Sequence, residues 1–184
     1  MDSSTAVPAP QSPTPVDTGN LRDALSRWAA GVTIVAAADA NGDDRHGMTA
    51  TAFSSVSVDP PLVAVMINRS HTISRFLADG TGVTVNVLAA DQRPLADRFA
   101  FVKDEDRFLV GDWQAGPTGV PVLGDALTWL AGRVERLVEV GSHYVVIVAV
   151  TEVATPRADA APLIYWHRDY RQLHLASSEA ESGS

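Results

Sequence analysis

Alternating hydroxyl side chains make residues 46–66 the part of the chain best suited to hold a flat polar ligand. We expect two short strands here, closed by the Pro60-Pro61 pair. In an extended strand every second side chain lies on the same face. On one face this stretch carries Thr49, Thr51, Phe53, Ser55 and Ser57. Buried hydroxyls need hydrogen-bond partners, so the pattern predicts a face that contacts either a polar ligand or water.

A second group of polar residues, 68–72, lies directly before a helix predicted over residues 73–78. It contains an arginine, a serine, a histidine and a threonine. Free backbone N–H groups and the helix dipole favour an anion at a helix N-terminus, which would suit a phosphate. The alternative is ordinary N-capping of the helix by Ser70 or Thr72.

Two more polar side chains interrupt apolar strand patterns. Asn86 lies in the middle of a strand predicted over residues 83–88, where asparagine is rare, so we expect its amide to make a specific hydrogen bond. His143 begins a core strand after the Gly141-Ser142 turn, where a ligand at the mouth of a barrel is within reach. The other histidines show no metal-ligand spacing and are expected to be structural or solvent-facing: His46, His71, His167 and His174.

Composition excludes several classes of function. The chain has no cysteine, which rules out disulfides, thiolate catalysis and cysteine-ligated metals. A net charge of −8 and a single lysine, Lys103, argue against binding to a nucleic-acid backbone. Nucleophile motifs, a Walker loop and a dinucleotide fingerprint are all missing from the sequence. The chemistry is therefore expected to come from a bound cofactor.

The start of the chain and its apolar runs bear on location. No apolar run approaches the roughly 18 residues of a membrane span. The first 17 residues lack the basic start and apolar middle of a secretory signal. A cytoplasmic protein is the expectation.

The elements that position these residues can be placed from periodicity. Strands are expected at residues 32–38, 62–67, 83–88, 127–140, 143–153, 163–167 and 171–174. Asn41-Gly42 predicts a hairpin turn after the first of them. Asp17 or Thr18 is expected to cap a helix whose apolar face holds Leu21, Leu25 and Trp28.

Later in the chain, a helix is expected over residues 91–99 with Asp91 as its cap, followed by a long loop at 100–125. About seven strands with two or three short helices predict a mainly β fold, an antiparallel barrel with helical insertions. A length of 184 residues fits one domain, at 18–175. Residues 1–17 and 176–184 are expected to be disordered tails, since their polar and proline-rich composition cannot form a core.

Several motifs, in order and over about residues 20–174, resemble the short-chain flavin reductase family. They are residues 30–35 (AGVTIV), 47–57 (GMTATAFSSVS), 60–63 (PPLV), 85–88 (VNVL) with Phe99, 119–123 (GVPVL), 141–143 (GSH), and 162–166 (PLIYW) with Tyr170. The resemblance implies an FMN-binding split β-barrel, usually a homodimer, that uses NADH or NADPH to reduce FMN or FAD. In such proteins reduced flavin commonly diffuses to the monooxygenase of a two-component system.

The resemblance also implies positions for the ligands. The isoalloxazine would be lined by Met48, Thr49, Ala50, Thr51, Ala52, Ser54 and Ser55, with backbone amides at its pyrimidine edge. The ribityl phosphate would lie near Ser70, His71 and Thr72, while Asn86 would lie beside the flavin and Phe99 is included among the cofactor-binding residues. His143 matches the histidine associated with the nicotinamide, and Ser142 stands where the family usually has an aspartate.

Three hypotheses follow. The first is an NAD(P)H:flavin oxidoreductase (EC 1.5.1.-) that feeds a monooxygenase. The second is a flavin-binding or flavin-sequestering module without useful turnover, which the serine at position 142 keeps open. The third is a split-barrel enzyme that uses flavin on an organic substrate under the 100–125 loop. FMN against FAD, and NADH against NADPH, stay open at this point, although Arg69, Arg93 and Arg98 are available for an extra phosphate.

Overall fold

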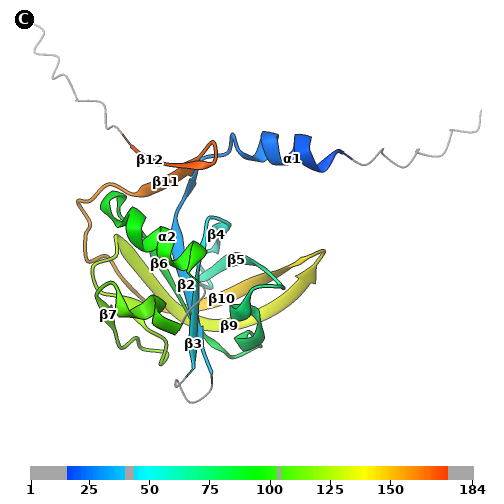
Figure 1. Cartoon of the computed structure of the whole chain (residues 1–184). Coiled ribbons are helices and arrows are strands. Elements are labelled where there is room, and N and C mark those ends of the chain that lie inside the picture. Colours follow the sequence, from blue (N-terminus) through cyan, green and yellow to red (C-terminus); the bar gives the residue numbers. More distant parts are fainter. Residues whose placement is uncertain (1–15, 40–43, 103–104, 174–184) are drawn as a thin grey trace, which may run out of the picture.

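The main sheet has seven antiparallel strands that curl around an apolar interior (Figure 1). The computed structural model describes residues 16–39, 44–102 and 105–173. The strand order is β3-β2-β6-β9-β10-β5-β4. The bounds are β2 (Thr33–Ala38), β3 (Arg45–Ala50), β4 (Phe53–Ser57), β5 (Leu62–Asn68), β6 (Gly82–Val87), β9 (Thr128–Val140) and β10 (His143–Ala154). The predicted mainly β, antiparallel architecture is confirmed.

Strands β3 and β4 follow each other in the chain but lie at opposite edges of the main sheet. Only Thr51 and Ala52, which we call the seam, separate them. The sheet therefore has to curve until its edges approach each other. At the seam the Ala52 carbonyl accepts a hydrogen bond from the Met66 N–H of β5 at 3.0 Å. This arrangement makes the sheet a barrel that is split beside the seam.

The predicted break within residues 46–66 is confirmed, but the single alternating face is not. Phe53 packs against the same core as Met48 and Ala50. The hydroxyl of Thr49 lies on the other side of the sheet, where it donates to the Ala96 carbonyl at 2.6 Å. Alternation does not continue across the seam because the two strands on either side of it belong to different sheet edges.

Two apolar clusters hold the barrel together, and β2 lies between them with all six residues buried. Ile34 packs into the cluster that faces the helices, whereas Val35 packs into the barrel interior. Successive side chains of a strand point to opposite faces. A strand buried on both faces therefore needs an apolar run, which residues 34–38 supply, and the buried Thr33 donates its hydroxyl to the Ala50 carbonyl at 2.8 Å.

Helix α2 (Arg93–Phe101) covers the outside of β2 and β3 through Leu95, Ala96 and Phe99. It begins two residues later than predicted, and the predicted cap at Asp91 is wrong. Proline at position 94 is favourable in the first turn of a helix, where its missing N–H costs nothing. Asp91 instead belongs to the short 3₁₀ helix η2 (Ala90–Gln92).

The region predicted as a long loop, residues 100–125, is largely structured. It contains the end of α2, the 3₁₀ helix η3 (Glu105–Leu109), and the paired strands β7 (Trp113–Gln114) and β8 (Val122–Leu123). Aromatic contacts fix it to the barrel, with the rings of Phe108 and Trp113 at 5.1 and 5.3 Å from that of Phe99. Large aromatic side chains bury enough surface to order such a segment.

Helix α1 (Thr18–Leu25) extends away from the barrel (Figure 1). The predicted cap is confirmed, because the Asp17 carboxylate accepts from the Asn20 N–H at 3.0 Å. The segment that follows α1 joins a three-stranded sheet of β1 (Ala30–Gly31), β11 (Leu163–Trp166) and β12 (Asp169–Gln172). Trp166 Nε1 anchors it further by donating to the Arg27 carbonyl at 3.1 Å.

Some expectations lie outside the described residues. The predicted tails do so except for residues 16 and 17, as do His174 and the Asn41-Gly42 turn. The hairpin itself is confirmed by the pairing of β2 with β3 and by the Asp39 N–H, which donates to the Asp44 carbonyl at 2.8 Å. Within the described ranges, the helices are too short or too polar to cross a membrane.

Candidate functional site

A cavity of about 740 Å³ opens at the seam, between α1, the edge of the barrel and the β11–β12 hairpin. Its wall includes Leu25, Trp28, Thr51, Ala52, Ser54, Met66, Tyr165 and Arg168. A second cavity of about 380 Å³ shares Thr51, Tyr165 and Arg168 with it and adds Thr49, Arg93 and Tyr170. Thr51 therefore stands between two adjoining cavities. Volumes of this size, with mixed apolar and hydroxyl walls, are typical of cofactor sites.

The hydroxyl groups at and beside the seam differ in their hydrogen bonds and exposure. The Thr49 hydroxyl is bound to α2 through the Ala96 carbonyl. Thr51 and Ser54 are exposed, and the Ser54 hydroxyl donates only to the neighbouring Ser55 carbonyl at 3.1 Å among the described residues. A ligand in the cavity can therefore meet Thr51 and Ser54 without breaking the fold.

The predicted ring-binding residues do not all reach these cavities. Thr49, Thr51, Ala52 and Ser54 line them. Met48 and Ala50 pack into the barrel core, and Ser55 is exposed opposite Val63 of β5.

Asn86, predicted beside the flavin, and Phe99, predicted among the cofactor-binding residues, are instead buried in the protein. Asn86 is 0% exposed. Its amide nitrogen donates to the Ile34 carbonyl at 3.1 Å, and its oxygen accepts from the Leu123 N–H at 2.8 Å. The expectation of a specific hydrogen bond is confirmed, but this bond joins β6 to β2 and β8. Phe99 is 1% exposed, in the aromatic cluster under α2. We leave both residues out of the site.

The second predicted group, residues 68–72, lies next to His143. Asn68 is the cross-strand partner of His143. The Arg69 N–H donates to the Ser142 carbonyl at 3.0 Å, and the Arg69 guanidinium pairs with Glu139 of β9. The loop and the Gly141-Ser142 turn are therefore one continuous surface, although they are distant in sequence.

The helix after this loop differs from the prediction in its type and in its capping. The helix that follows is η1 (Thr72–Phe76), a five-residue 3₁₀ helix, which is too short to carry a useful dipole. The Ser70 N–H and hydroxyl both contact the Asn68 side-chain oxygen at 2.9 Å, so neither serine nor threonine caps η1. Exposed Ser70, His71 and Thr72 remain as donors beside Arg69.

These two groups of residues lie along the end of one strand. Met66 contacts the seam through its N–H, and Asn68 lies two residues further along β5. At about 3.3 Å per residue the separation is about 7 Å. The seam cavity lies beside Met66, and the 68–72 loop and His143 lie side by side at the end of β5, which suits an elongated ligand with a flat ring at one end and a phosphate at the other.

His143 is exposed, and its ring has one partner among the described residues. The Ser142 hydroxyl lies 2.9 Å from Nδ1 of His143, and either atom can donate, depending on the tautomer of the ring. A hydroxyl thus occupies the place of the expected carboxylate.

Sequence analysis missed the wall opposite the seam. Tyr165 and Tyr170 pack edge to face with ring centroids 5.4 Å apart, and the Arg93 guanidinium lies 5.2 Å above the Tyr170 ring. Burial, followed by the nearby Asp97 carboxylate, raises the pKa of Tyr170, so this phenol stays protonated. The family-like aromatics of the last hairpin were the available signal, but nothing in their spacing indicates that they face the seam.

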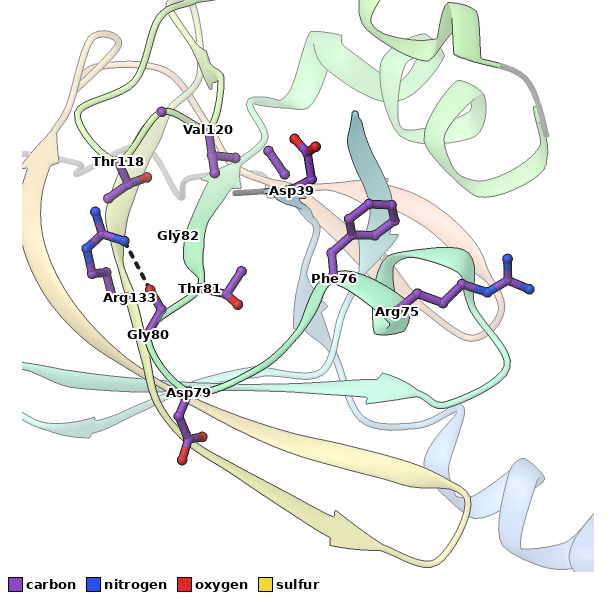
Figure 2. A pocket seen from close by; sticks show the side chains of 12 residues that line it. Asp39, Arg75, Phe76, Asp79, Gly80, Thr81, Gly82, Thr118, Val120 and Arg133 are labelled. Atoms are coloured by element: carbon purple, nitrogen blue, oxygen red, sulfur yellow. Dashed lines mark hydrogen bonds between the residues drawn. The ribbon is translucent and has the colours of Figure 1, made fainter. Parts of the chain in front are cut away.

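A further cavity lies elsewhere, between the ends of β2, β6 and β9, the end of η1 with the segment after it, and residues 118–120 (Figure 2). It measures about 770 Å³ and contains none of the predicted site residues. Arg133 donates to the Gly80 carbonyl at 3.0 Å, and Asp79 accepts from the Leu137 N–H at 3.0 Å. Because these charged groups hold the turn before β6, size alone does not make this cavity the site.

Comparison with known proteins decides the family. A model of the flavin reductase like domain matches residues 25–174. The chain belongs to this family. It is 37% identical to an NADH:FMN oxidoreductase of Rhodococcus qingshengii, over 88% of this chain and 84% of that protein. It is 36% identical to the 4-hydroxyphenylacetate 3-monooxygenase reductase component of Salmonella dublin, over 85% of this chain and 92% of that protein.

A solved member of the family confirms the split-barrel fold. The NADH:FAD oxidoreductase SgcE6 of Streptomyces globisporus, in complex with NAD and FAD fragments, superposes with a TM-score of 0.78 at 29% identity, covering 89% of this chain and 95% of that one. A probable flavin reductase of Rhizobium meliloti, 37% identical over 71% of this chain, is longer, and the chain spans 42% of its length. The predicted family and fold are confirmed.

Proposed function

We propose that this protein reduces a flavin with NADH and supplies the reduced flavin to a separate monooxygenase. The observation that carries the proposal is the continuous surface formed by the seam cavity, the 68–72 loop and His143. It provides a recess, a group of phosphate donors and an imidazole around the end of β5. Membership of the flavin reductase like family supports the same activity, as does the NADH named for two of its relatives.

The seam residues would hold the flavin ring. Small side chains at Ala52 and Ser54 allow a flat ring to approach the backbone, and the hydroxyls of Thr51 and Ser54 offer hydrogen bonds. Trp28 and Tyr165 form apolar and aromatic parts of the wall, which exclude water from the ring. A bound flavin supplies the acceptor for the hydride. The protein provides placement and a dry contact between two stacked rings.

Residues 69–72 would bind the phosphate end. Arg69 is suited to this because a guanidinium forks onto phosphate oxygens. It pairs with Glu139 in this structure, so a phosphate would share or replace an existing partner. The neighbouring Ser70 and Thr72 add hydroxyl donors.

His143 would hold the nicotinamide, either by anchoring its carboxamide or by supplying a proton as the reduced flavin forms. We favour anchoring, because hydride transfer needs ring alignment more than it needs a general acid. The residue is exposed and lies beside the phosphate loop, in reach of a second nucleotide stacked on the flavin.

A direct assay tests the function. Purified protein is mixed with NADH or NADPH and with FMN or FAD, and the loss of nicotinamide absorbance is followed. We expect turnover, with NADH preferred over NADPH. No oxidation in any of the four mixtures would remove the proposal. The identity of the preferred flavin and donor would also settle the finer enzyme class.

Replacement of His143 by alanine tests its role. We expect the apparent Michaelis constant for NADH to rise more than that for flavin, because only the nicotinamide loses its contact. Steady-state kinetics with each substrate varied in turn provide the measurement. An equal rise for both substrates would make His143 a structural residue.

A flavin-sequestering module is the second candidate, and the serine at position 142 is the observation that favours it. It predicts that the purified protein retains flavin tightly and oxidises no pyridine nucleotide. A visible spectrum of fresh protein, followed by the assay above, separates the two functions. The monooxygenase partner is proposed because the Salmonella dublin relative is named as the reductase component of such a system. The cytoplasmic location stays a prediction.

We also propose that the protein is a homodimer and that α1 contributes to the contact. No residue of α1 is buried, and its apolar face carries Leu21 and Leu25, with Trp28 just beyond the helix, at 49%, 62% and 77% exposure. An exposed apolar face of this kind is typical of a surface that another protein covers. It adjoins the seam cavity, so a second copy placed there would also close the flavin site.

A further inference from the structure

Ser142, in the turn before β10, contacts both the 68–72 loop and the ring of His143. Its carbonyl accepts from the Arg69 N–H at 3.0 Å, which fixes the turn to the 68–72 loop. Its hydroxyl lies 2.9 Å from Nδ1 of His143. Gly141 has a φ of +57°, a left-handed conformation that glycine adopts at no steric cost and that starts the turn. The backbone of Ser142 is therefore fixed independently of its side chain.

The acids near His143 are not placed to hold its ring. Along β9 the cross-strand partner of His143 is Val140, whereas Glu139 is opposite Tyr144 and so belongs to the other face of the sheet. Glu139 is also paired with Arg69. On the β5 side the neighbour is Asn68, whose side-chain oxygen accepts from Ser70. The Ser142 hydroxyl is the group that contacts Nδ1 among the described residues.

We propose that Ser142 is a positioning residue that donates its hydroxyl hydrogen to Nδ1 of His143, which leaves Nε2–H as a donor for the nicotinamide carboxamide oxygen. The inference rests on the proposed function. A carboxylate at position 142 could only accept, so it would hold Nδ1–H and turn Nε2 of the neutral ring into an acceptor. A serine permits the opposite tautomer. The protein would then bind the carbonyl end of the carboxamide and not its amino end.

The tautomer of the ring can be measured without any flavin or nucleotide. Imidazole nitrogen shifts of the ¹⁵N-histidine-labelled protein identify the protonated nitrogen, and the His143→Ala protein assigns the signal. We expect Nε2–H at His143 in the natural protein, and Nδ1–H or the doubly protonated ring in Ser142→Asp. Nδ1–H in the natural protein would overturn the proposal. This readout does not depend on whether the protein turns over.

Kinetics of three variants test the consequence for the nicotinamide. Ser142→Ala should raise the Michaelis constant for NADH by about 2- to 10-fold, the effect of one hydrogen bond, with the flavin dissociation constant and kcat little changed. Ser142→Thr keeps the hydroxyl and should stay within about twofold of the natural protein. An unchanged constant in Ser142→Ala, or an equal rise for flavin, would overturn the positioning role.

The pH dependence of the NADH Michaelis constant in Ser142→Asp separates a positioning role of Ser142 from a purely structural one. In the natural protein Nε2 carries a hydrogen in both the neutral and the protonated ring, so the NADH Michaelis constant should depend little on pH. In Ser142→Asp the protonated ring still donates from Nε2, but the neutral ring does not. Its Michaelis constant should therefore rise with pH. Identical profiles for the two proteins would contradict the proposal, whereas absence of turnover in the natural protein would instead refute the proposed function.

Discussion

Thr51 is the seam residue that lines both cavities, so its hydroxyl is a direct test of where the flavin ring lies. We expect Thr51→Val to weaken flavin binding by about 0.5–1.5 kcal/mol, one net hydrogen bond, without a comparable loss of stability. Fluorescence titration of FMN and FAD gives the dissociation constants.

The matched control for this variant is Thr128→Val. It removes the same hydroxyl from a position where it donates to the Ala154 carbonyl at 2.8 Å, outside both seam cavities. It should lower stability and leave the flavin dissociation constant unchanged. If Thr51→Val also left that constant unchanged, Thr51 would not belong to the site.

Asn86 is expected to support the fold and not the ligand. Asn86→Leu fits the volume but removes the partner of the Leu123 N–H, together with a second donor to the Ile34 carbonyl, which keeps its backbone partner in β6. It should destabilise the protein by about 1–3 kcal/mol for each buried backbone group left unpaired. Urea unfolding measures the loss, and Asn20→Leu on exposed α1 should change stability by less than about 0.5 kcal/mol. A stable Asn86→Leu protein that no longer binds flavin would return Asn86 to the site.

For single residues, the sequence showed which polar side chains need a hydrogen-bond partner, but it did not show what that partner is. Asn86 was recognisable because an amide inside an apolar strand needs partners, and it has them. Which side of the strand faces a ligand depends on how the sheet closes, and periodicity contains no information on closure. The same reason explains why Thr51 and Ser54 reach the cavities while Ala50 faces the core.

Among the elements, η2 is tied to the 155–162 segment by the pair of Asp91 with Arg157, at 2.9 and 3.0 Å. The hydrogen bond from Arg157 lowers the pKa of Asp91 despite a small opposing effect of burial. A carboxylate with a lowered pKa in the folded state stabilises the fold above its unfolded pKa, and this contribution disappears as pH falls through the folded value.

Arg157→Gln therefore has a pH-dependent effect on stability. We expect a loss of about 0.2–1 kcal/mol near neutral pH, since the pair is partly exposed. The difference should shrink as Asp91 is protonated, and it should also shrink in high salt. Urea unfolding at neutral and at acidic pH measures it. A difference that persisted after acidification would show that Arg157 acts through packing and not through its charge.

The predicted boundaries of helices and strands were correct where nearby side chains determine them. They were wrong where contacts between distant segments determine them. The α1 cap follows from the Asp17 side chain alone. The pairing of β9 with β10 is irregular at Gly132, where a register shift lies opposite it between Val150 and Glu152. A Cβ at Gly132 would lie 2.2 Å from the Ala149 carbonyl oxygen, so the strands approach too closely for a side chain. Residues 100–125 were assigned to a loop because their order comes from aromatic contacts with α2.

For the whole molecule, the main expectation is the dimer. Trp28→Ser removes the most exposed aromatic beside α1 and should shift the protein toward monomer. Size-exclusion chromatography with light scattering measures the mass, and Leu109→Ser, which changes an equally exposed apolar residue on η3, is the control. A natural protein that is monomeric, or a Trp28→Ser protein that remains a dimer, would contradict a contact made by α1.

The overall architecture was predictable because most strands of the barrel have their own β-branched pattern and the family motifs span most of the chain. The site was predictable only in part, because its two halves come from segments that the sequence separates widely. Local patterns locate the 68–72 loop and the 141–143 turn, but only the register of β5 with β10 shows that they are neighbours.

The contact between the 68–72 loop and the 141–143 turn also bears on how the protein folds. Arg69 and Glu139 touch across 70 positions of the chain, and Asn68 meets His143 over a still longer span. Contacts of such long range form late, after slow loop closure. A chain that lacks β10 lacks His143 and the strand that pairs with β5, so we expect full ligand binding only from the completed barrel. A ligand at a hundredfold excess over its dissociation constant would then protect the finished barrel by about 2.7 kcal/mol.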